Sequence, residues 1–151
     1  WIRMIIGTGV DITKIERFEN WFTHSDEKLN RVLSQQEVDY CRTNKTMSAQ
    51  RFAARFAARE ALYKALSAAQ LINNLPLLTL CKTVRITHGS QGAPLINLDW
   101  SQLSIEPKQY QHLKLNLCLA HERCCAIAVV TIEHTSCKDC TAKFSISADK
   151  N

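Results

Sequence analysis

The 151-residue chain lacks any long hydrophobic run. No apolar stretch approaches the roughly 20 residues that a helix needs to span a bilayer. The segment from Trp1 to Val10 also lacks the long apolar region and the small-residue cleavage site of a secretory signal. These absences predict a cytoplasmic protein without a membrane partner.

The sequence also lacks the pattern of a disulfide framework. It has seven cysteines, an odd number that, without a secretory signal, favours reduced thiols. His134, Cys137 and Cys140 have the local spacing of a zinc or redox half-site, but no second well-spaced pair would complete four ligands. The favoured interpretation is an ordinary polar tail.

Internal repeats and low-complexity segments are absent as well, so a single domain is expected. A chain of this length with 46% hydrophobic residues can bury enough surface for one core. We predict one domain over residues 1–135, followed by a polar C-terminal tail over residues 136–151.

The net charge of +5 suits an acidic partner or a phosphorylated ligand, and it equally suits a nucleic acid. The sequence has no RNA-binding aromatic motif, zinc-finger spacing or long basic segment. A nucleic-acid-binding module is therefore the weaker alternative, motivated by three arginines along one predicted helix, and no nucleic-acid partner is expected.

The first half of the chain has mainly helical patterns. Residues 4–10 form an apolar run with two glycines, which predicts a strand that a ligand or another backbone approaches closely. Thr13 with Glu16 and Ser34 with Glu37 have the spacing of capping boxes and predict two helix starts. An alanine-rich pattern predicts a long helix over residues 48–68.

The second half changes to the period of strands. Residues 84–86 and 94–98 flank a turn at residues 89–92, which predicts a hairpin. Leucines alternate with other residues over 113–119 and face the core, His121 continues their phase, and residues 126–132 form a buried strand. The expected fold class is α+β, with an antiparallel sheet packed against a long helix and shorter helices.

Two carboxylates stand where folding does not require them. Asp11 ends the first strand, and Glu60 interrupts a helix otherwise suited for packing, with Lys64 one turn later. Magnesium usually binds through one or two carboxylates plus substrate phosphates. Asp11 and Glu60 are therefore candidate metal ligands, and Arg55, Arg59 and Lys64 could meet phosphate charge.

A plainer interpretation stays open on spacing alone. Asp11 could cap the following helix, and Glu60 with Lys64 could be a solvated pair worth about 0.3–0.5 kcal/mol. His121 could equally be an ordinary histidine at the end of a strand.

Several motifs, taken together, resemble those of holo-acyl-carrier-protein synthases, a type within the 4'-phosphopantetheinyl transferase superfamily. The motifs are GTGVDITKIER at residues 7–17, RVLSQQE at 31–37, RFAAREALYKAL at 55–66, GAP at 92–94 and LAHE at 119–122. The resemblance covers residues 4–133 and implies the 4'-phosphopantetheinyl transferase fold.

The resemblance also implies site residues. Asp11 and Glu60 would hold Mg²⁺, and the catalytic residues would be Glu60, Lys64 and His121. The residues expected to contact coenzyme A are Arg55, Arg59, Lys64, Gly92, Pro94 and His121. In the implied reaction, a carrier-protein serine attacks the β-phosphorus of coenzyme A and releases adenosine 3',5'-bisphosphate, in support of fatty acid biosynthesis. Glu60, acting directly or through a metal-bound water, is the candidate base.

Acyl-carrier protein is the implied macromolecular partner. Proteins of that class are acidic, so Lys14 and Arg17 on the first predicted helix are candidate contacts, with Arg31 and Arg42 as further ones. A plain solvated helix face is the alternative for each of them. The family also implies a homotrimer that binds coenzyme A between subunits.

The sequence departs from the family pattern at several positions. Arg59 replaces the usual lysine before the metal-binding glutamate, and residues 67–69 replace a glycine-rich turn. Cys118 and Ala120 stand where hydroxyl residues usually precede His121. These differences motivate a second alternative, a weakened homologue that binds coenzyme A or a carrier protein without transferring anything.

Overall fold

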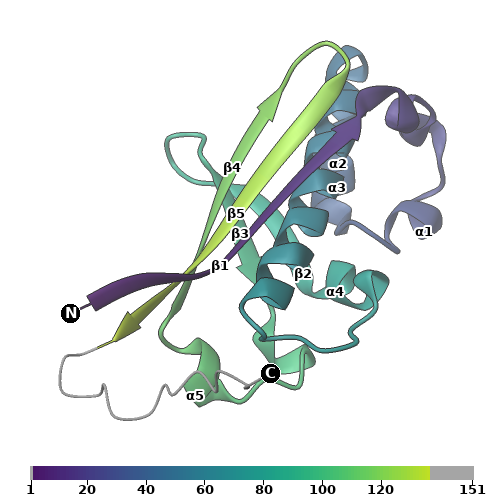
Figure 1. Ribbon diagram of the computed structural model, residues 1–151. Coiled ribbons are helices and arrows are strands. Elements are labelled where there is room, and N and C mark those ends of the chain that lie inside the picture. The colour runs from purple at the N-terminus through teal and green to yellow at the C-terminus, as the bar shows by residue number, and fades with distance from the viewer. Residues whose placement is uncertain (1, 137–151) are drawn as a thin grey trace, which may run out of the picture.

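The computed structural model describes residues 2–136 and contains one main sheet and one long helix (Figure 1). The main sheet is antiparallel, in the order β1–β5–β4. Its strands are β1 (Ile2–Lys14), β5 (Cys125–Ser136) and β4 (Leu113–His121). The long helix α3 (Lys45–Ala68) packs on one face of this sheet. This arrangement confirms the predicted α+β class.

The remaining elements are short. A two-stranded hairpin consists of β2 (Val84–His88) and β3 (Pro94–Leu98), as the alternating pattern predicted. The short helices are η1 (Ile15–Thr23), α1 (Asp26–Leu29), α2 (Gln35–Arg42), α4 (Leu77–Thr83), η2 (Trp100–Gln102) and α5 (Pro107–Tyr110). Among residues 2–136, no helix combines the length and the hydropathy that crossing a bilayer requires.

The glycines of β1 allow the strand to approach α3 closely. A Cβ atom on Gly7 would overlap the carbonyl oxygen of Ala65, and one on Gly9 would overlap that of Ala61. The prediction that another backbone approaches this strand is therefore confirmed, and the approaching backbone is that of α3. This contact fixes the position of Asp11, two residues after Gly9, relative to the helix.

The two predicted capping boxes have different outcomes. At the start of α2, the Ser34 hydroxyl accepts a hydrogen bond from the Glu37 amide, and the Glu37 carboxylate accepts one from the Ser34 amide, as predicted. The prediction at Thr13 is wrong, because pairing with β5 keeps Thr13 in β1, opposite Ala126. Its hydroxyl instead accepts a hydrogen bond from Arg17.

The larger core cluster lies between α3 and the sheet. Small side chains of α3, such as Ala61 and Ala65, pack with Val130 and Ile132 of β5. The alternating leucines over residues 113–119 of β4 pack against this cluster, as predicted. A second cluster joins Phe18 of η1 to α2 and to the first half of α3. Together the clusters position the start of η1 beside the middle of the long helix.

Candidate active site

Asp11 and Lys64 meet where β1 crosses α3. The Nζ atom of Lys64 lies 2.9 Å from the Asp11 carboxylate and 2.9 Å from the carbonyl oxygen of Val10. The Asp11 side chain is 15% exposed and that of Lys64 is 49% exposed. Asp11 pairs with Ala128 inside the sheet, so it does not cap the following helix.

Glu60 lies one helical turn before Lys64 and faces the same junction. Burial raises the pKa of Glu60, and the negative charge of Asp11 raises it further, while Lys64 and Arg17 act in the opposite direction. The two carboxylates are therefore close enough to repel each other, and the nearby cations offset this only in part. Such a site favours an additional positive charge.

The donor set fits a hard divalent cation that also binds a phosphorylated ligand. Within residues 2–136, no group of three or more histidine, cysteine, aspartate or glutamate side chains could hold a metal. Asp11 and Glu60 would thus supply two carboxylates and leave the other positions to phosphate and water, which is the usual manner of Mg²⁺ binding. The half-site at Cys137 and Cys140 lies outside the described residues.

The two cations predicted on the first helix occupy different surroundings. Arg17 donates to Thr13 (2.9 Å), and its guanidinium lies 5.8 Å from the ring centroid of Phe56. Its charge acts on Glu60, so it lies on the side of η1 nearest to the carboxylates. Lys14 is the last residue of β1, so its predicted place on the helix is wrong, because strand pairing extends as far as Cys125. It is exposed and forms an ion pair with Glu16 (3.3 Å).

Arg59 has a structural environment, and its predicted contact with cofactor phosphate is corrected. Its side chain is fully buried and donates to both carboxylate oxygens of Glu37, at 2.9 and 2.7 Å. It also donates to the carbonyl oxygen of Val84, at 2.9 Å. The guanidinium thus joins α3 to α2 and β2, and it is not accessible to a ligand.

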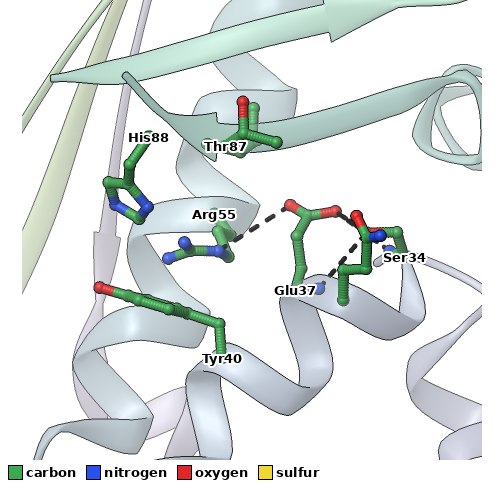
Figure 2. A pocket seen from close by; sticks show the side chains of 8 residues that line it. Ser34, Glu37, Tyr40, Arg55, Thr87 and His88 are labelled. Atoms are coloured by element: carbon green, nitrogen blue, oxygen red, sulfur yellow. Dashed lines mark hydrogen bonds and ion pairs between the residues drawn. The ribbon is translucent and has the colours of Figure 1, made fainter. Parts of the chain in front are cut away.

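Arg55, one turn earlier on α3, lines a cavity of about 300 Å³ between α2, α3 and β2 (Figure 2). The cavity is lined by Ser34, Gln36, Glu37, Tyr40, Arg55, Ile86, Thr87 and His88. The Arg55 guanidinium stacks on the Tyr40 ring at 4.3 Å. Its buried Nε atom lies 4.0 Å from the Glu37 carboxylate and has no hydrogen-bond partner. A buried, cationic and incompletely paired side chain is suited to an anionic ligand.

The β2–β3 hairpin lies beside this cavity. His88 contacts the Tyr40 ring, with centroids 5.0 Å apart, and it pairs with Pro94 across the hairpin. Burial lowers the pKa of His88, and the charges of Arg55 and Arg51 lower it further. Gly92 forms the turn with a φ of 80°, which favours glycine. Of the hairpin residues predicted to contact the cofactor, Pro94 therefore lies opposite a cavity residue, and Gly92 forms the turn two residues earlier.

Sequence reasoning missed Tyr40 and His88 as cavity residues. Tyr40 follows Glu37 by three positions on α2, so both side chains face α3. That spacing was the only available signal for Tyr40. No sequence signal indicated His88, because its position beside the cavity depends on how the hairpin packs against α2.

His121 is separate from both groups of residues. It ends β4, is exposed, and pairs with Ala126, which places it on the same face of the sheet as Asp11. His121 thus lies on the same face of β4 as the alternating leucines, as predicted. Two strand spacings separate it from β1, however, and the hydrogen bonds and ion pairs found among residues 2–136 do not connect it to the carboxylates.

The turn after α3 forms without the glycines common in the family. Gln70 adopts a left-handed φ of 55°, and the Leu71 amide donates to the Leu66 carbonyl oxygen. This hydrogen bond joins an amide to the carbonyl oxygen five residues earlier and is typical of a Schellman motif, which usually has glycine at the left-handed position. The replacement at residues 67–69 therefore does not prevent the turn.

Comparison with known proteins adds to this geometry. Residues 7–128 match the family described as the 4'-phosphopantetheinyl transferase superfamily. The chain is 37% identical over 132 residues to a holo-[acyl-carrier-protein] synthase from Treponema pallidum strain Nichols, with 86% of this chain and 97% of that protein covered. It is 33% identical over 134 residues to the synthase from Geobacter sp. strain M21, with 86% and 99% covered.

A solved structure also resembles this fold. The crystal structure of a holo-[acyl-carrier-protein] synthase from Helicobacter pylori, in complex with coenzyme A, is 29% identical to the chain and matches it with a TM-score of 0.61. The match covers 83% of this chain and 98% of that one. The relatives are thus matched over nearly their whole length.

Proposed function

The chain belongs to the 4'-phosphopantetheinyl transferase superfamily, and we propose that it transfers the 4'-phosphopantetheine arm of coenzyme A to a serine of an apo-acyl-carrier protein. The products would be the holo-carrier protein and adenosine 3',5'-bisphosphate. Relatives that are named holo-[acyl-carrier-protein] synthases and matched over nearly their whole length support this reaction.

The main supporting observation is the junction of Asp11, Glu60 and Lys64. Two carboxylates on separate elements lie close together beside one ammonium group. Mg²⁺ held by Asp11 and Glu60 would neutralise negative charge on the diphosphate of coenzyme A. Lys64 would exchange its contact with Asp11 for a phosphate oxygen.

Glu60 is the proposed base. A carboxylate oxygen of Glu60 would accept the proton of the carrier-protein serine as the serine oxygen attacks the β-phosphorus. The bond from that phosphorus to the oxygen of the adenosine-bearing phosphate then breaks. Glu60 would act either directly or through a metal-bound water.

The cavity at Arg55 is the proposed site for the adenosine end of coenzyme A. Arg55 would pair with an anionic group there, and the adjacent hairpin with Gly92 and Pro94 would border the ligand. The Nε atom of the buried Arg55 has an ion-pair contact with Glu37 (4.0 Å) but no hydrogen bond, which supports an anionic occupant. His121 remains a proposed contact to the cofactor, whereas Arg59 has no place in this proposal.

A homotrimer is the proposed assembly. The carboxylates and the Arg55 cavity lie on different sides of α3, so a ligand shared between subunits would explain why a single chain separates them. The face of the sheet away from α3 has exposed apolar side chains, including Ile5, Val10, Ile12 and Ile127. An uncovered apolar patch of this kind supports a subunit interface.

The acidic carrier protein would approach η1. Lys14 is exposed at the end of β1, directly before η1, and Arg17 lies on η1 near Glu60, so both could guide an acidic partner towards the reacting groups. The proposed setting is the cytoplasm, where holo-carrier protein would serve fatty acid biosynthesis.

The proposed reaction is tested by incubating the protein with coenzyme A, Mg²⁺ and an apo-acyl-carrier protein, followed by mass spectrometry of the carrier. We expect the carrier to gain one phosphopantetheine, and we expect Asp11→Ala, Glu60→Ala and chelation each to abolish the gain. Asp39→Ala, which removes an exposed carboxylate on α2, is the matched control and should retain activity. No gain with several carrier proteins would contradict the proposal and favour a homologue that only binds.

A further inference from the structure

Two adjacent cysteines lie at the tip of the β4–β5 hairpin. Cys124 ends the connection between the strands and is exposed, while Cys125 begins β5 and is partly exposed. Cys41 and Cys81, in contrast, are buried. The hairpin pair is thus accessible to reagents in solution, and the proposed transfer reaction does not use it.

The two residues are adjacent in sequence, and Cys124 is the more exposed of the two. The pKa of Cys125 is raised by its side-chain interaction with Cys124 and by burial. A thiolate is the reactive form of cysteine, so Cys124 is the better placed nucleophile and Cys125 the second, resolving thiol.

We infer that Cys124 and Cys125 form a reversible oxidation site, at which a peroxide joins the two adjacent residues by a disulfide. The Cys124 thiolate attacks one peroxide oxygen, the O–O bond breaks, and Cys124 becomes a sulfenic acid while hydroxide leaves and takes up a proton as water. The Cys125 thiol then attacks the Cys124 sulfur, loses its proton and displaces a second water. For hydrogen peroxide, two thiols and one peroxide yield one disulfide and two waters, with a two-electron oxidation of sulfur.

Sequence adjacency makes such a disulfide easy to reduce. Cα atoms across a trans peptide are about 3.8 Å apart. Ordinary disulfides join Cα atoms roughly 4.4–6.8 Å apart, and shorter spans are strained. Strained and exposed disulfides are the labile ones, so a mild thiol would restore the dithiol.

Oxidation would also act on the start of η1. The peptide between Cys124 and Cys125 would become part of the closed ring, and its carbonyl oxygen belongs to Cys124. That oxygen accepts a hydrogen bond of 2.8 Å from the amide of Ile15, the first residue of η1. Ring closure must turn this peptide and thereby weaken the bond that ties η1 to the hairpin.

The first test is mass spectrometry of the full chain after limited treatment with hydrogen peroxide, alkylation of free thiols and tryptic digestion. We expect the peptide that begins at Cys124 to lose two hydrogens, to show Cys124 and Cys125 unalkylated, and to recover on reduction. Cys118→Ser should give the same product. A bond from either residue to Cys118 or Cys137, or oxidation of Cys124 to a sulfinic acid while Cys125 stays free, would overturn the inference.

Hydrogen exchange tests the link to η1. In the oxidised protein the Ile15 amide should exchange roughly fivefold to tenfold faster, as expected for the loss of one hydrogen bond, and reduction should reverse the change. Cys125→Ser treated with peroxide cannot close the ring and should show no such increase. Unchanged exchange at Ile15 after confirmed disulfide formation would overturn the coupling. Neither measurement depends on phosphopantetheine transfer.

Discussion

At the scale of single residues, two arginines one turn apart on α3 make different contacts. Both are buried near Glu37, but Arg59 donates hydrogen bonds to its carboxylate, whereas Arg55, one turn earlier, stacks on Tyr40 and lines the cavity. Both are arginines in the same repeated motif, RFAARFAARE, so their side chains alone do not separate them. The difference arises from the α2 residue that each arginine meets, which is Glu37 for the hydrogen bonds of Arg59 and Tyr40 for the stacking of Arg55.

Glu37 gives the fold a predictable response to acid. Burial alone would raise the pKa of this carboxyl, but the charge and hydrogen bonds of Arg59, with those of Ser34, lower it below the ordinary value of 4.5. A lowered pKa in the folded state stabilises the protein above the unfolded pKa, and this contribution is lost as the pH falls through the folded pKa.

Glu37→Gln should therefore weaken that pH dependence. At neutral pH the variant leaves Arg59 buried without its counterion, which should lower the free energy of unfolding by about 3–5 kcal/mol. Urea unfolding from neutral pH to below pH 4.5 should show a steeper loss in the parent than in the variant. Parallel pH curves for the two proteins would contradict the assigned role of the pair.

Gly9 is the clearest case of a required glycine. In Gly9→Ala, the added Cβ would overlap the carbonyl oxygen of Ala61, so β1 and α3 must separate. We expect a loss of about 1–3 kcal/mol in unfolding free energy together with reduced transfer activity, because Asp11 moves with β1. Gly89→Ala is the control, since its Cβ would make an ordinary contact of 3.5 Å with Leu95. Equal stability of the two variants would argue against the close approach.

At the scale of elements, η1 joins the proposed partner surface to the reacting groups. It begins at Ile15, directly after β1, and packs Phe18 into the second core cluster. Lys14 therefore stays at the surface, while Arg17 faces the carboxylates. The junction of β1 and η1 would thus combine partner attraction with proximity to Glu60.

This arrangement predicts different kinetic effects for the two cations. Lys14→Glu should raise the KM for carrier protein by roughly twofold to fivefold, an effect that salt reduces, with little change in kcat. Arg17→Ala should lower kcat as well, because its charge acts on Glu60. Lys108→Glu on α5 is the charge-matched control and should leave both constants unchanged. A purely kcat effect at Lys14 would contradict its proposed surface role.

At the scale of the whole molecule, residues 2–136 leave one face of the main sheet uncovered. The helices lie on the other side of the main sheet (Figure 1). Ile12 is 63% exposed and sits opposite Ile127 on β5, and Val10 sits opposite Val129. Apolar side chains that are aligned across strands in this manner are better explained by a second protein surface than by water.

Ile12→Asp should therefore prevent the proposed trimer. Sedimentation should give about three times the 17.2 kDa chain mass for the parent and a single chain mass for the variant. Transfer activity should fall with assembly, since the two groups of ligand-binding residues would no longer face each other. Leu78→Asp on α4, also at an exposed apolar residue, should leave the mass unchanged. A monomeric parent would refute the proposed assembly.

The sequence by itself determined the features that depend on near neighbours. The capping box at Ser34, the alanine-rich α3, the β2–β3 hairpin and the alternating leucines of β4 all follow from spacings of two to four residues. Family motifs also identified Asp11, Glu60 and Lys64, although their meeting required the fold. The glycines of β1 predicted a close approach but not its partner.

The tertiary structure alone decided which local tendencies prevail. Strand pairing with β5 removed Thr13 from its predicted cap, because a ladder of hydrogen bonds outweighs one capping bond. Arg59 was predicted to contact phosphate, but it forms a buried ion pair with Glu37, which lies 22 residues earlier in the sequence. Tyr40 and His88 joined one cavity because helix and hairpin pack together. Such outcomes depend on contacts between distant residues, and local spacing does not encode those contacts.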